Sequence, residues 1–337
     1  MLGSDVSLIQ GALKANGQVF LINPNGELFS PTAQVDVGSL VASTRDLSTS
    51  DFLAGRYVLD GAGSNAVINQ GRITAAGDAG QGGTVALIAA RVSNEGSVNA
   101  PAGNVLLAAG KRVTLDLGGP LKLQVEQGAL DALVSNGGAI VADGGLIYLT
   151  AKAADQLTSA TVNNTGLVRA RTLATGERGE IRLIGDLAHG TLNAGGTLDA
   201  SAPQGGNGGF IETSAATVNM ADTLSVTTLA PHGATGTLLV DPNNYTVAAS
   251  GGNATGASFT SLINSNNVTI STASYGTAGG SGDIFINDTA SWAAGLLTLV
   301  AERNIAINSP LNGAGIALQY GQASTAGTGA SYSINAP

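Results

Sequence analysis

Short runs of apolar and polar residues, punctuated by glycine, recur along most of the chain. One run has nine residues, with aliphatic residues at positions one and seven, asparagine at three, glycine at five and alanine at nine. It occurs at 67–75, 92–100, 134–142 and 162–170, and at 192–200 with alanine in place of asparagine. A second run opens on glycine and is interpreted as alternating at a period of two; it occurs at 83–89, 103–109, 145–151, 179–185 and 209–215. These patterns predict short strands joined by glycine turns.

The runs return at intervals of roughly 20 to 40 residues, a period that is typical of a solenoid. A single coil cannot bury its own apolar face, whereas stacked coils bury equivalent aliphatic residues in a continuous column. Strands of successive coils would pair in parallel about 4.8 Å apart. We interpret the asparagine of the nine-residue run as a stacked turn residue that bonds to the backbone or to its counterpart in the next coil. Contact with a ligand is the alternative.

Residues 16–57 carry the most specific pattern in the chain. Gln18–Ile22 has the composition of a short strand. Asn23, Pro24, Asn25 and Gly26 then predict a tight turn, because proline fixes φ and lacks an N–H, while Asn-Gly suits positions that need a positive φ. The alternation at 33–37 predicts a half-buried strand.

Three ordered blocks in this segment resemble the secretion domain of filamentous haemagglutinin-type exoproteins, the secreted partners of two-partner secretion systems. The blocks are Asn16–Gly26, Ser39–Ser43 and Phe52–Gly55. The resemblance implies an extracellular, right-handed parallel β-helix that is exported unfolded through a dedicated outer-membrane barrel, a TpsB-type transporter. It also implies that the Asn23–Gly26 turn is needed for secretion, and we interpret its residues as turn formers and not as catalysts.

The resemblance also bears on how the chain is organised. In this family a signal peptide and several capping strands normally precede the first block, whereas residues 1–5 here lack the basic start and apolar stretch of a signal peptide. We therefore expect a fragment, with a truncated secretion domain and the first coils at 1–235 and further shaft repeats at 236–337. Residues near 248–282 are rich in Gly, Ser and Asn and predict loops or a loosened coil, with one strand at Asn267–Ser271.

Composition favours a repetitive β architecture and argues against several partners. Glycine supplies 49 of 337 residues, and charged residues reach 11%, against roughly 25% in average soluble domains. A net charge of −9 argues against nucleic acid, because phosphate contacts need a basic face. No apolar run approaches the roughly 20 residues of a transmembrane segment. The chain has no cysteine, and its histidines, His189 and His232, are far apart, so no metal or cofactor is predicted.

Polysaccharide lyases also use parallel β-helices, and they need convergent carboxylates or a base with basic partners. The candidate acids are scattered, and the sequence shows no pair repeating at coil spacing beside an arginine or lysine: Asp116, Asp143, Asp155, Asp186, Asp199, Glu212 and Asp222. We interpret them as solvated turn carboxylates. No common hydrolase or phosphate-binding motif is present, so we predict that the chain is not an enzyme.

The sequence therefore favours a fragment of a secreted, filamentous haemagglutinin-like adhesin that is associated with the outer surface of a bacterial cell. Its partners would be the outer-membrane transporter and a glycan or protein receptor on a host cell or other surface. Haem- or haemopexin-binding exoproteins share the secretion domain and are one alternative. Contact-dependent toxins and cytolysins are another, and a β-helix polysaccharide lyase is the least favoured.

Overall fold

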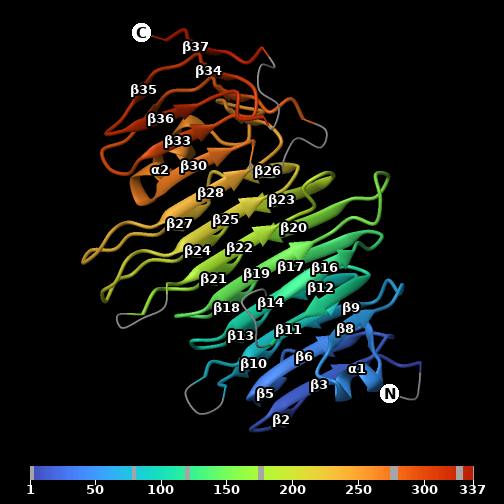
Figure 1. Cartoon of the computed structure of the whole chain (residues 1–337). Coiled ribbons are helices and arrows are strands. Elements are labelled where there is room, and N and C mark those ends of the chain that lie inside the picture. The colour runs from blue at the N-terminus through green and yellow to red at the C-terminus, as the bar shows by residue number, and fades with distance from the viewer. Residues whose placement is uncertain are drawn as a thin grey trace. The chain divides into compact units, whose positions relative to one another are not determined.

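The chain divides into two compact units, residues 1–170 and residues 171–337. Its structure, a computed structural model, describes residues 4–77, 81–117, 122–173, 178–273, 280–323 and 329–336. In both units short strands stack in parallel sheets (Figure 1).

Three parallel sheets form the body of the first unit, and the chain passes through them in turn. The first sheet contains β1 (Ser7–Ile9), β4 (Glu27–Phe29), β9 (Ala66–Asn69), β12 (Arg91–Asn94), β17 (Ala132–Asn136) and β20 (Ala160–Asn164). The second contains β2 (Ala12–Lys14), β5 (Gln34–Val37), β10 (Arg72–Ala75), β13 (Ser97–Asn99), β18 (Ala139–Val141) and β21 (Leu167–Arg169). The third contains β3 (Gln18–Ile22), β6 (Ser39–Ser43), β11 (Thr84–Ala89), β14 (Asn104–Ala109) and β19 (Leu146–Ala151). One passage through the three sheets makes one coil.

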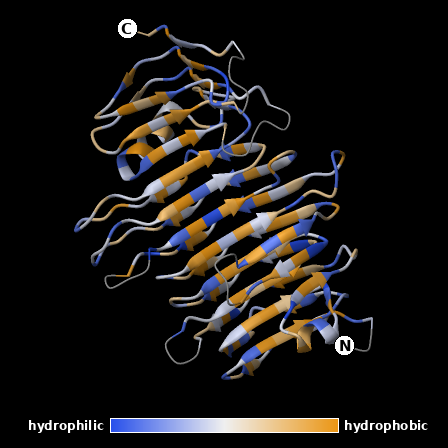
Figure 2. Ribbon diagram, in the orientation of Figure 1, coloured by the Kyte–Doolittle hydropathy of each residue, from blue (hydrophilic) through white to orange (hydrophobic). Residues whose placement is uncertain are grey.

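Each nine-residue run of the first unit supplies one strand to the first sheet and one to the second. Val92 lies in register with Val67 on one side and Val134 on the other, and Val162 extends the column. These four valines are at most 1% exposed. Figure 2 shows apolar residues concentrated along the stacked strands. The predicted all-β, right-handed parallel β-helix is therefore confirmed, together with its buried aliphatic column.

The glycines of the nine-residue runs mark places where the backbones of successive coils touch. A Cβ atom added to Gly96 would lie 2.1 Å from the carbonyl oxygen of Gly71. The corresponding distance is 2.0 Å from Gly138 to the oxygen of Gly96, and 2.0 Å from Gly166 to the oxygen of Gly138. Because a side chain cannot fit at these distances, the glycine of the repeat is required by close approach of the coils.

An antiparallel sheet, which the sequence did not predict, covers the outer face of the third parallel sheet. Its strands lie in the order β16 (Leu123–Gln127), β15 (Arg112–Leu115), β8 (Tyr57–Asp60) and β7 (Asp46–Leu47), and helix α1 (Thr49–Leu53) precedes β8. Leu59, Val113 and Leu123 of this sheet form a buried cluster with Ile88 and Leu106 of the parallel sheet. The first unit therefore has a second core outside the coils.

This second core corrects our interpretation of two seven-residue runs as strands that alternate at a period of two. Every residue of β11 is buried, and so is every residue of β14 except Asn104. Strands that are covered on both faces have continuous apolar runs. The runs Val85–Ala89 and Val105–Ala109 thus reflect strands that lie between two layers.

The second unit is built from parallel strands in the same way. One pair is β23 (Gly190–Ala194) with β26 (Thr217–Met220), and another is β24 (Thr197–Asp199) with β27 (Ser225–Thr227). A longer sheet contains β22 (Glu180–Ile184), β25 (Phe210–Ser214), β28 (Thr237–Asp241), β30 (Asn267–Ser271), β33 (Leu297–Val300) and β36 (Ile316–Gln319). The remaining strands are β29 (Tyr245–Val247), β31 (Ile284–Ile286), β34 (Ile305–Ile307), β37 (Tyr332–Ile334), β32 (Ala290–Ser291) and β35 (Leu311–Asn312).

A helix, α2 (Gly256–Ser265), lies where the sequence predicted loops or a loosened coil. Thr255 caps its N-terminus in a capping box with Ser258, so both side chains bond to backbone N–H groups. Phe259, Leu262 and Ile263 are buried at the spacing of one helical face. The Gly- and Ser-rich composition of this segment hid that spacing. The predicted strand at Asn267–Ser271 is present as β30, and residues 274–279 lie outside the described residues.

Candidate functional site

The predicted turn joins β3 to β4 and is closed by its own backbone. Gly26 N donates to Asn23 O at 3.0 Å, and Gly26 has a φ of +118°, which favours glycine. Asn23 N donates to Ser43 O at 2.9 Å, which extends the pairing of β3 with β6 into the turn. The backbone of the turn is thus fixed on both sides.

The side chain of Asn23 lies at the centre of this arrangement and is 1% exposed. Its Nδ2 donates to Asp5 O at 2.9 Å and to Ser7 Oγ at 2.8 Å. Its Oδ1 accepts from the backbone N of Asn25 at 3.0 Å and from Asn25 Nδ2 at 3.2 Å. One buried amide therefore joins the turn to β1 of the preceding coil, and replacement of Asn23 by alanine would remove these four hydrogen bonds.

Pro24 and Asn25 are more exposed than the other two residues of the motif, Asn23 and Gly26, which are buried. Pro24 is exposed and Asn25 is partly exposed. The carbonyl oxygen of Pro24 accepts a hydrogen bond of 2.8 Å from Asn65 Nδ2, in the segment that follows β8. The motif is therefore divided between buried residues that shape the turn and residues that a partner can reach.

The structure brings the three sequence blocks together around Phe20. β6, which holds the second block, pairs in parallel with β3 and places Val41 opposite Phe20. Phe52 of the third block lies edge-on to Phe20, with ring centroids 5.2 Å apart, and Tyr57 stacks on Phe20 at 5.3 Å. Ser48 caps the N-terminus of helix α1, because its hydroxyl accepts from Asp51 N, and the helix carries Phe52 to this position.

Arg45 is a fully buried cation that sequence reasoning missed. Its Nε donates to Gly110 O at 2.7 Å, and its Nη1 donates to Gly63 O at 2.6 Å. Burial lowers the pKa of Arg45 from its ordinary value, and the charge of Asp60 opposes that shift. Arg45 ties the end of β6 to segments 18 and 65 residues away, and no local pattern marks such a contact.

Glu27 directly follows the turn, and it too was missed. Its side chain is 1% exposed, and neither carboxylate oxygen has a hydrogen-bond partner among the described residues. Burial raises the pKa of Glu27 to about 9, and interaction with the backbone of Ser43 and Asn23 opposes the shift in part. Because Glu27 lies in register with Val67, aligning the two segments would have revealed a carboxyl group at an interior position.

The asparagines of the nine-residue runs form a buried ladder, as our main interpretation predicted. Asn69 Nδ2 donates to Asn94 Oδ1, Asn94 Nδ2 to Asn136 Oδ1, and Asn136 Nδ2 to Asn164 Oδ1, each at 2.7 Å. All four side chains are at most 1% exposed. Each amide bonds to its counterpart in the next coil, and this burial leaves no surface for a ligand.

Three of the candidate acids are paired with arginines of a neighbouring coil, which corrects the prediction that no such pair exists. Asp143 pairs with Arg169, Asp199 with Arg171 and Glu212 with Arg182, at N···O distances of 2.8, 2.8 and 2.7 Å. Glu212 and Asp199 are buried and are therefore not solvated turn carboxylates.

The other candidate acids lie apart from these pairs. Asp155 accepts from Leu157 N, Asp186 from Ala188 N and His189 N, and Asp222 from the Thr255 hydroxyl. Among the described residues, no three His, Cys, Asp or Glu side chains are grouped so that they could hold a metal ion. The acids of the described chain thus act mainly in ion pairs and turns.

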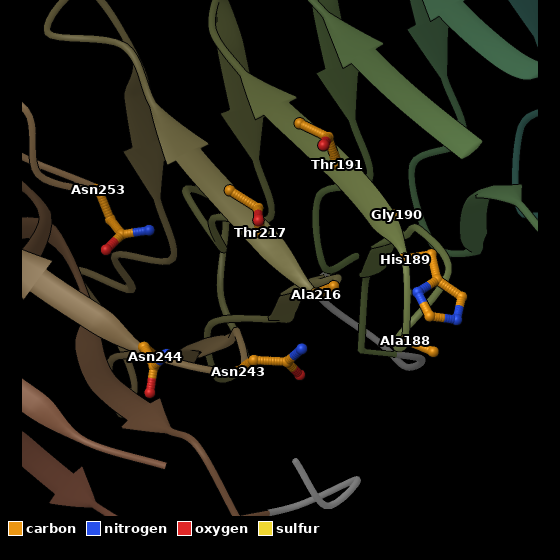
Figure 3. Close-up of a pocket in the computed structure, with 9 residues that line it drawn as sticks. All are labelled: Ala188, His189, Gly190, Thr191, Ala216, Thr217, Asn243, Asn244 and Asn253. Atoms are coloured by element: carbon orange, nitrogen blue, oxygen red, sulfur yellow. The ribbon is translucent and has the colours of Figure 1, made fainter. Parts of the chain in front are cut away.

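An open cavity of about 490 Å³ lies beside β23 and β26 in the second unit (Figure 3). Hydroxyl, amide and imidazole groups line it, from Thr191, Thr217, Asn243, Asn253 and His189 among others. His232 is not part of its lining. The described residues that line it include no aspartate, glutamate, lysine or arginine.

A family model described as TPS secretion domain matches residues 2–199 of this chain. Among solved structures, the HMW1 secretion domain from Haemophilus influenzae has a TM-score of 0.54 and 19% identity, with 94% of this chain and 84% of that chain covered. At this identity the likeness shows a shared fold.

Two heme/hemopexin-binding proteins of Haemophilus influenzae are similar in sequence. The protein of strain Rd is 33% identical over 159 residues, which cover 46% of this chain and 17% of that protein. The other is 47% identical over 47 residues, or 14% of this chain and 5% of that protein. The matches thus span less than a fifth of the length of either relative.

Within the described residues, no helix is long and apolar enough to cross a bilayer.

Proposed function

The chain belongs to the family of TPS secretion domains, and from that premise we propose that residues 16–57 direct export of a two-partner exoprotein through a TpsB-type outer-membrane transporter. The transporter would recognise this segment in an extended form. The observation that carries the proposal is the convergence of all three sequence blocks on β3 and the Asn23–Gly26 turn. The turn is the point at which the exported segment would begin to coil.

Folding outside the cell would then favour export in one direction. Each new coil stacks its aliphatic residues on the coil before it, so a folded coil opposes movement of the chain back through the pore. The turn forms before the later coils, and Asn23 ties it to β1 of the preceding coil. Loss of Asn23 would delay the first stacking step and so reduce the secreted yield.

A secretion assay in cells that also express the transporter tests this role. We expect the double variant Asn23→Ala, Pro24→Ala to reduce the secreted yield of the exoprotein by about tenfold or more. The matched control is Pro242→Ala, Asn243→Ala, which alters a second Pro-Asn turn, at the end of β28, and should be secreted at close to the normal yield. Normal secretion of the Asn23, Pro24 variant would overturn the proposal.

We further propose that the whole exoprotein is a surface-associated adhesin, with these coils at the base of a fibre and a host or surface glycan or protein as its receptor. The parallel coils favour this role because they form a repetitive scaffold, and the acids of the described residues are mostly paired or in turns. Adherence of cells with and without the full-length exoprotein tests it. Equal adherence to every surface tried would contradict an adhesive role.

Haem or haemopexin capture is a second candidate function, favoured by the two relatives whose names state that binding. The cavity around His189 does not fit haem, because its lining is largely polar and porphyrin pockets are mostly apolar. Capture would then depend on other parts of the exoprotein. We expect haem titration of this chain to give no absorbance band of histidine-ligated haem. A band that appears in the wild type and is lost in His189→Ala would show that haem binds at this cavity, and would contradict the assignment of haem capture to other parts of the exoprotein.

A further inference from the structure

The open cavity beside β23 and β26, here called the polar groove, lies over the outer face of these two strands (Figure 3). β23 pairs with β26 so that Thr191 lies opposite Thr217. The residues that follow them, Leu192 and Val218, are buried, whereas Thr191 is partly exposed and Thr217 is exposed. The spacing of neighbouring strands separates the two threonines by roughly 4.8 Å. Two hydroxyl groups thus lie side by side on the floor of the groove.

These hydroxyl groups and one amide are available for hydrogen bonds. Among the described residues, neither the Thr191 nor the Thr217 hydroxyl has a hydrogen-bond partner. Asn244 also lines the groove, and its Oδ1 accepts from the backbone N of Ser281 and of Asp283, both at 3.1 Å. These bonds fix the amide of Asn244 and leave its Nδ2 able to donate to another molecule.

The rim of the groove is held by hydrogen bonds within the second unit. The side chain of Asn253 is fixed at both ends, because its Nδ2 donates to Val218 O at 2.8 Å and its Oδ1 accepts from Thr246 N at 2.7 Å. On the other side, the Asp186 carboxylate accepts from the backbone N of His189 at 2.9 Å. A rim that is already ordered loses little conformational entropy when a ligand binds.

The chemistry of the lining favours an uncharged ligand that is rich in hydroxyl groups. Apart from the imidazole of His189, the described lining residues offer hydroxyl, amide, methyl and backbone groups. Such groups bond well to hydroxyls, but they supply no charge to offset the desolvation of a carboxylate or sulfate. The net charge of −9 on the chain also opposes an anionic ligand. A volume of about 490 Å³ is within the range of small-molecule sites.

We propose that the polar groove binds an uncharged saccharide. The hydroxyls of Thr191 and Thr217 and the Nδ2 of Asn244 bond to hydroxyl groups of one or two sugar rings. This site gives the surface receptor a chemical class and places one contact within this chain. As an adhesive contact it rests on the proposed adhesive role of the whole exoprotein, whereas saccharide binding itself does not.

Saturation-transfer NMR of the purified 337-residue protein tests this proposal. The uncharged probes are lactose, N,N′-diacetylchitobiose and mannobiose, and sialyllactose is the anionic probe. We expect saturation transfer to at least one uncharged probe, and weaker transfer to sialyllactose. Titration of the best probe then gives an association constant for the wild type and for each variant.

The double variant Thr191→Val, Thr217→Val removes both hydroxyls and keeps the β-branched shape that suits a strand. We expect the association constant to fall by roughly two- to tenfold for each hydroxyl lost. The matched control is Thr197→Val, at a partly exposed position of β24 that does not line the groove. Its association constant should equal that of the wild type.

A second variant, Thr217→Arg, places a long side chain over the floor of the groove and should abolish binding. Because Thr217 is exposed, the fold should be retained, and thermal unfolding of each variant checks this. The proposal would be overturned by no transfer to any uncharged probe, by stronger transfer to sialyllactose, or by equal binding in the wild type and the groove variants. An equal loss of binding in Thr197→Val would overturn it as well.

The adherence assay of the full-length exoprotein is separate from this experiment. Cells can fail to adhere although the purified chain binds a saccharide, and they can adhere through another part of the exoprotein although the groove binds none. Either proposal can therefore fail without the other.

Discussion

The two N-terminal coils (β1–β3 and β4–β6) and the repeat coils built on β9, β12, β17 and β20 share one plan but bury different side chains. The repeat coils stack valine on valine and asparagine on asparagine. At the same two positions β4 has Glu27, opposite Val67, and Phe29, opposite Asn69. Because the same residues recur, each repeat coil packs its valine on the next valine and pairs its asparagine with the next asparagine. The N-terminal coils instead combine a specific turn with a buried carboxyl group.

The largest effect is expected when a carboxyl group is placed in a repeat coil, at a position equivalent to that of Glu27. We expect Val92→Glu to reduce the free energy of unfolding by about 4 kcal/mol or more at pH 7, because coils enclose this position on both sides. Much of the loss should be recovered near pH 4, where both folded and unfolded states are protonated. Urea denaturation measures the effect, with Val92→Gln as the uncharged control. A loss of under about 1 kcal/mol would mean that carboxyl groups are tolerated throughout the column.

The asparagine ladder gives the next largest effect. Asn94→Ala removes two buried amide bonds and leaves Asn69 and Asn136 without these partners, so we expect a loss of about 2–4 kcal/mol. Asn219→Ala, which removes a 2.9 Å bond to Asn193 on the surface, should change stability by less than about 0.5 kcal/mol. Chemical denaturation of both variants measures the difference. Similar losses of stability in the two variants would show that buried asparagine pairs contribute no more to stability than a pair on the surface.

A smaller effect is expected where the three sequence blocks meet. Phe52 is 44% exposed and contacts Phe20 edge-on, so Phe52→Ala should cost about 1 kcal/mol. Leu53→Ala, at a side chain that is 78% exposed, is the control and should stay within about 0.5 kcal/mol of the wild type. Thermal unfolding can resolve this difference. A cost at Leu53 equal to that at Phe52 would argue against a specific aromatic contact.

Repetition explains how much of the fold could be predicted from the sequence. The same residues recur at the same spacing, so the strands, the valine column and the asparagine ladder could all be read from the nine-residue run. The Asn23–Gly26 turn could also be predicted, because proline and Asn-Gly have strong local preferences. Its burial pattern could not, since Asn23 reaches back to Ser7 across a coil.

The features that were missed depend on contacts without a fixed period. β15 pairs with β8 through Arg112 and Asp60, 52 residues apart, and no local pattern connects them. The ion pairs of neighbouring coils were hidden because their sequence separations vary, from 26 residues for Asp143 and Arg169 to 30 for Arg182 and Glu212. Insertions of different length between strands thus conceal contacts that the stacked coils bring together.

Secreted yield, compared between the two regions, tests most directly the claim that the N-terminal turn and not overall stability governs export. Asn94→Ala weakens the repeat coils, and Asn23→Ala, Pro24→Ala alters the turn; both are expressed with the transporter and quantified outside the cell. We predict that the Asn94 variant is exported at close to the wild-type yield, while the Asn23, Pro24 variant falls by about tenfold or more. Yields that follow the measured loss of stability, whichever region carries the substitution, would contradict this account.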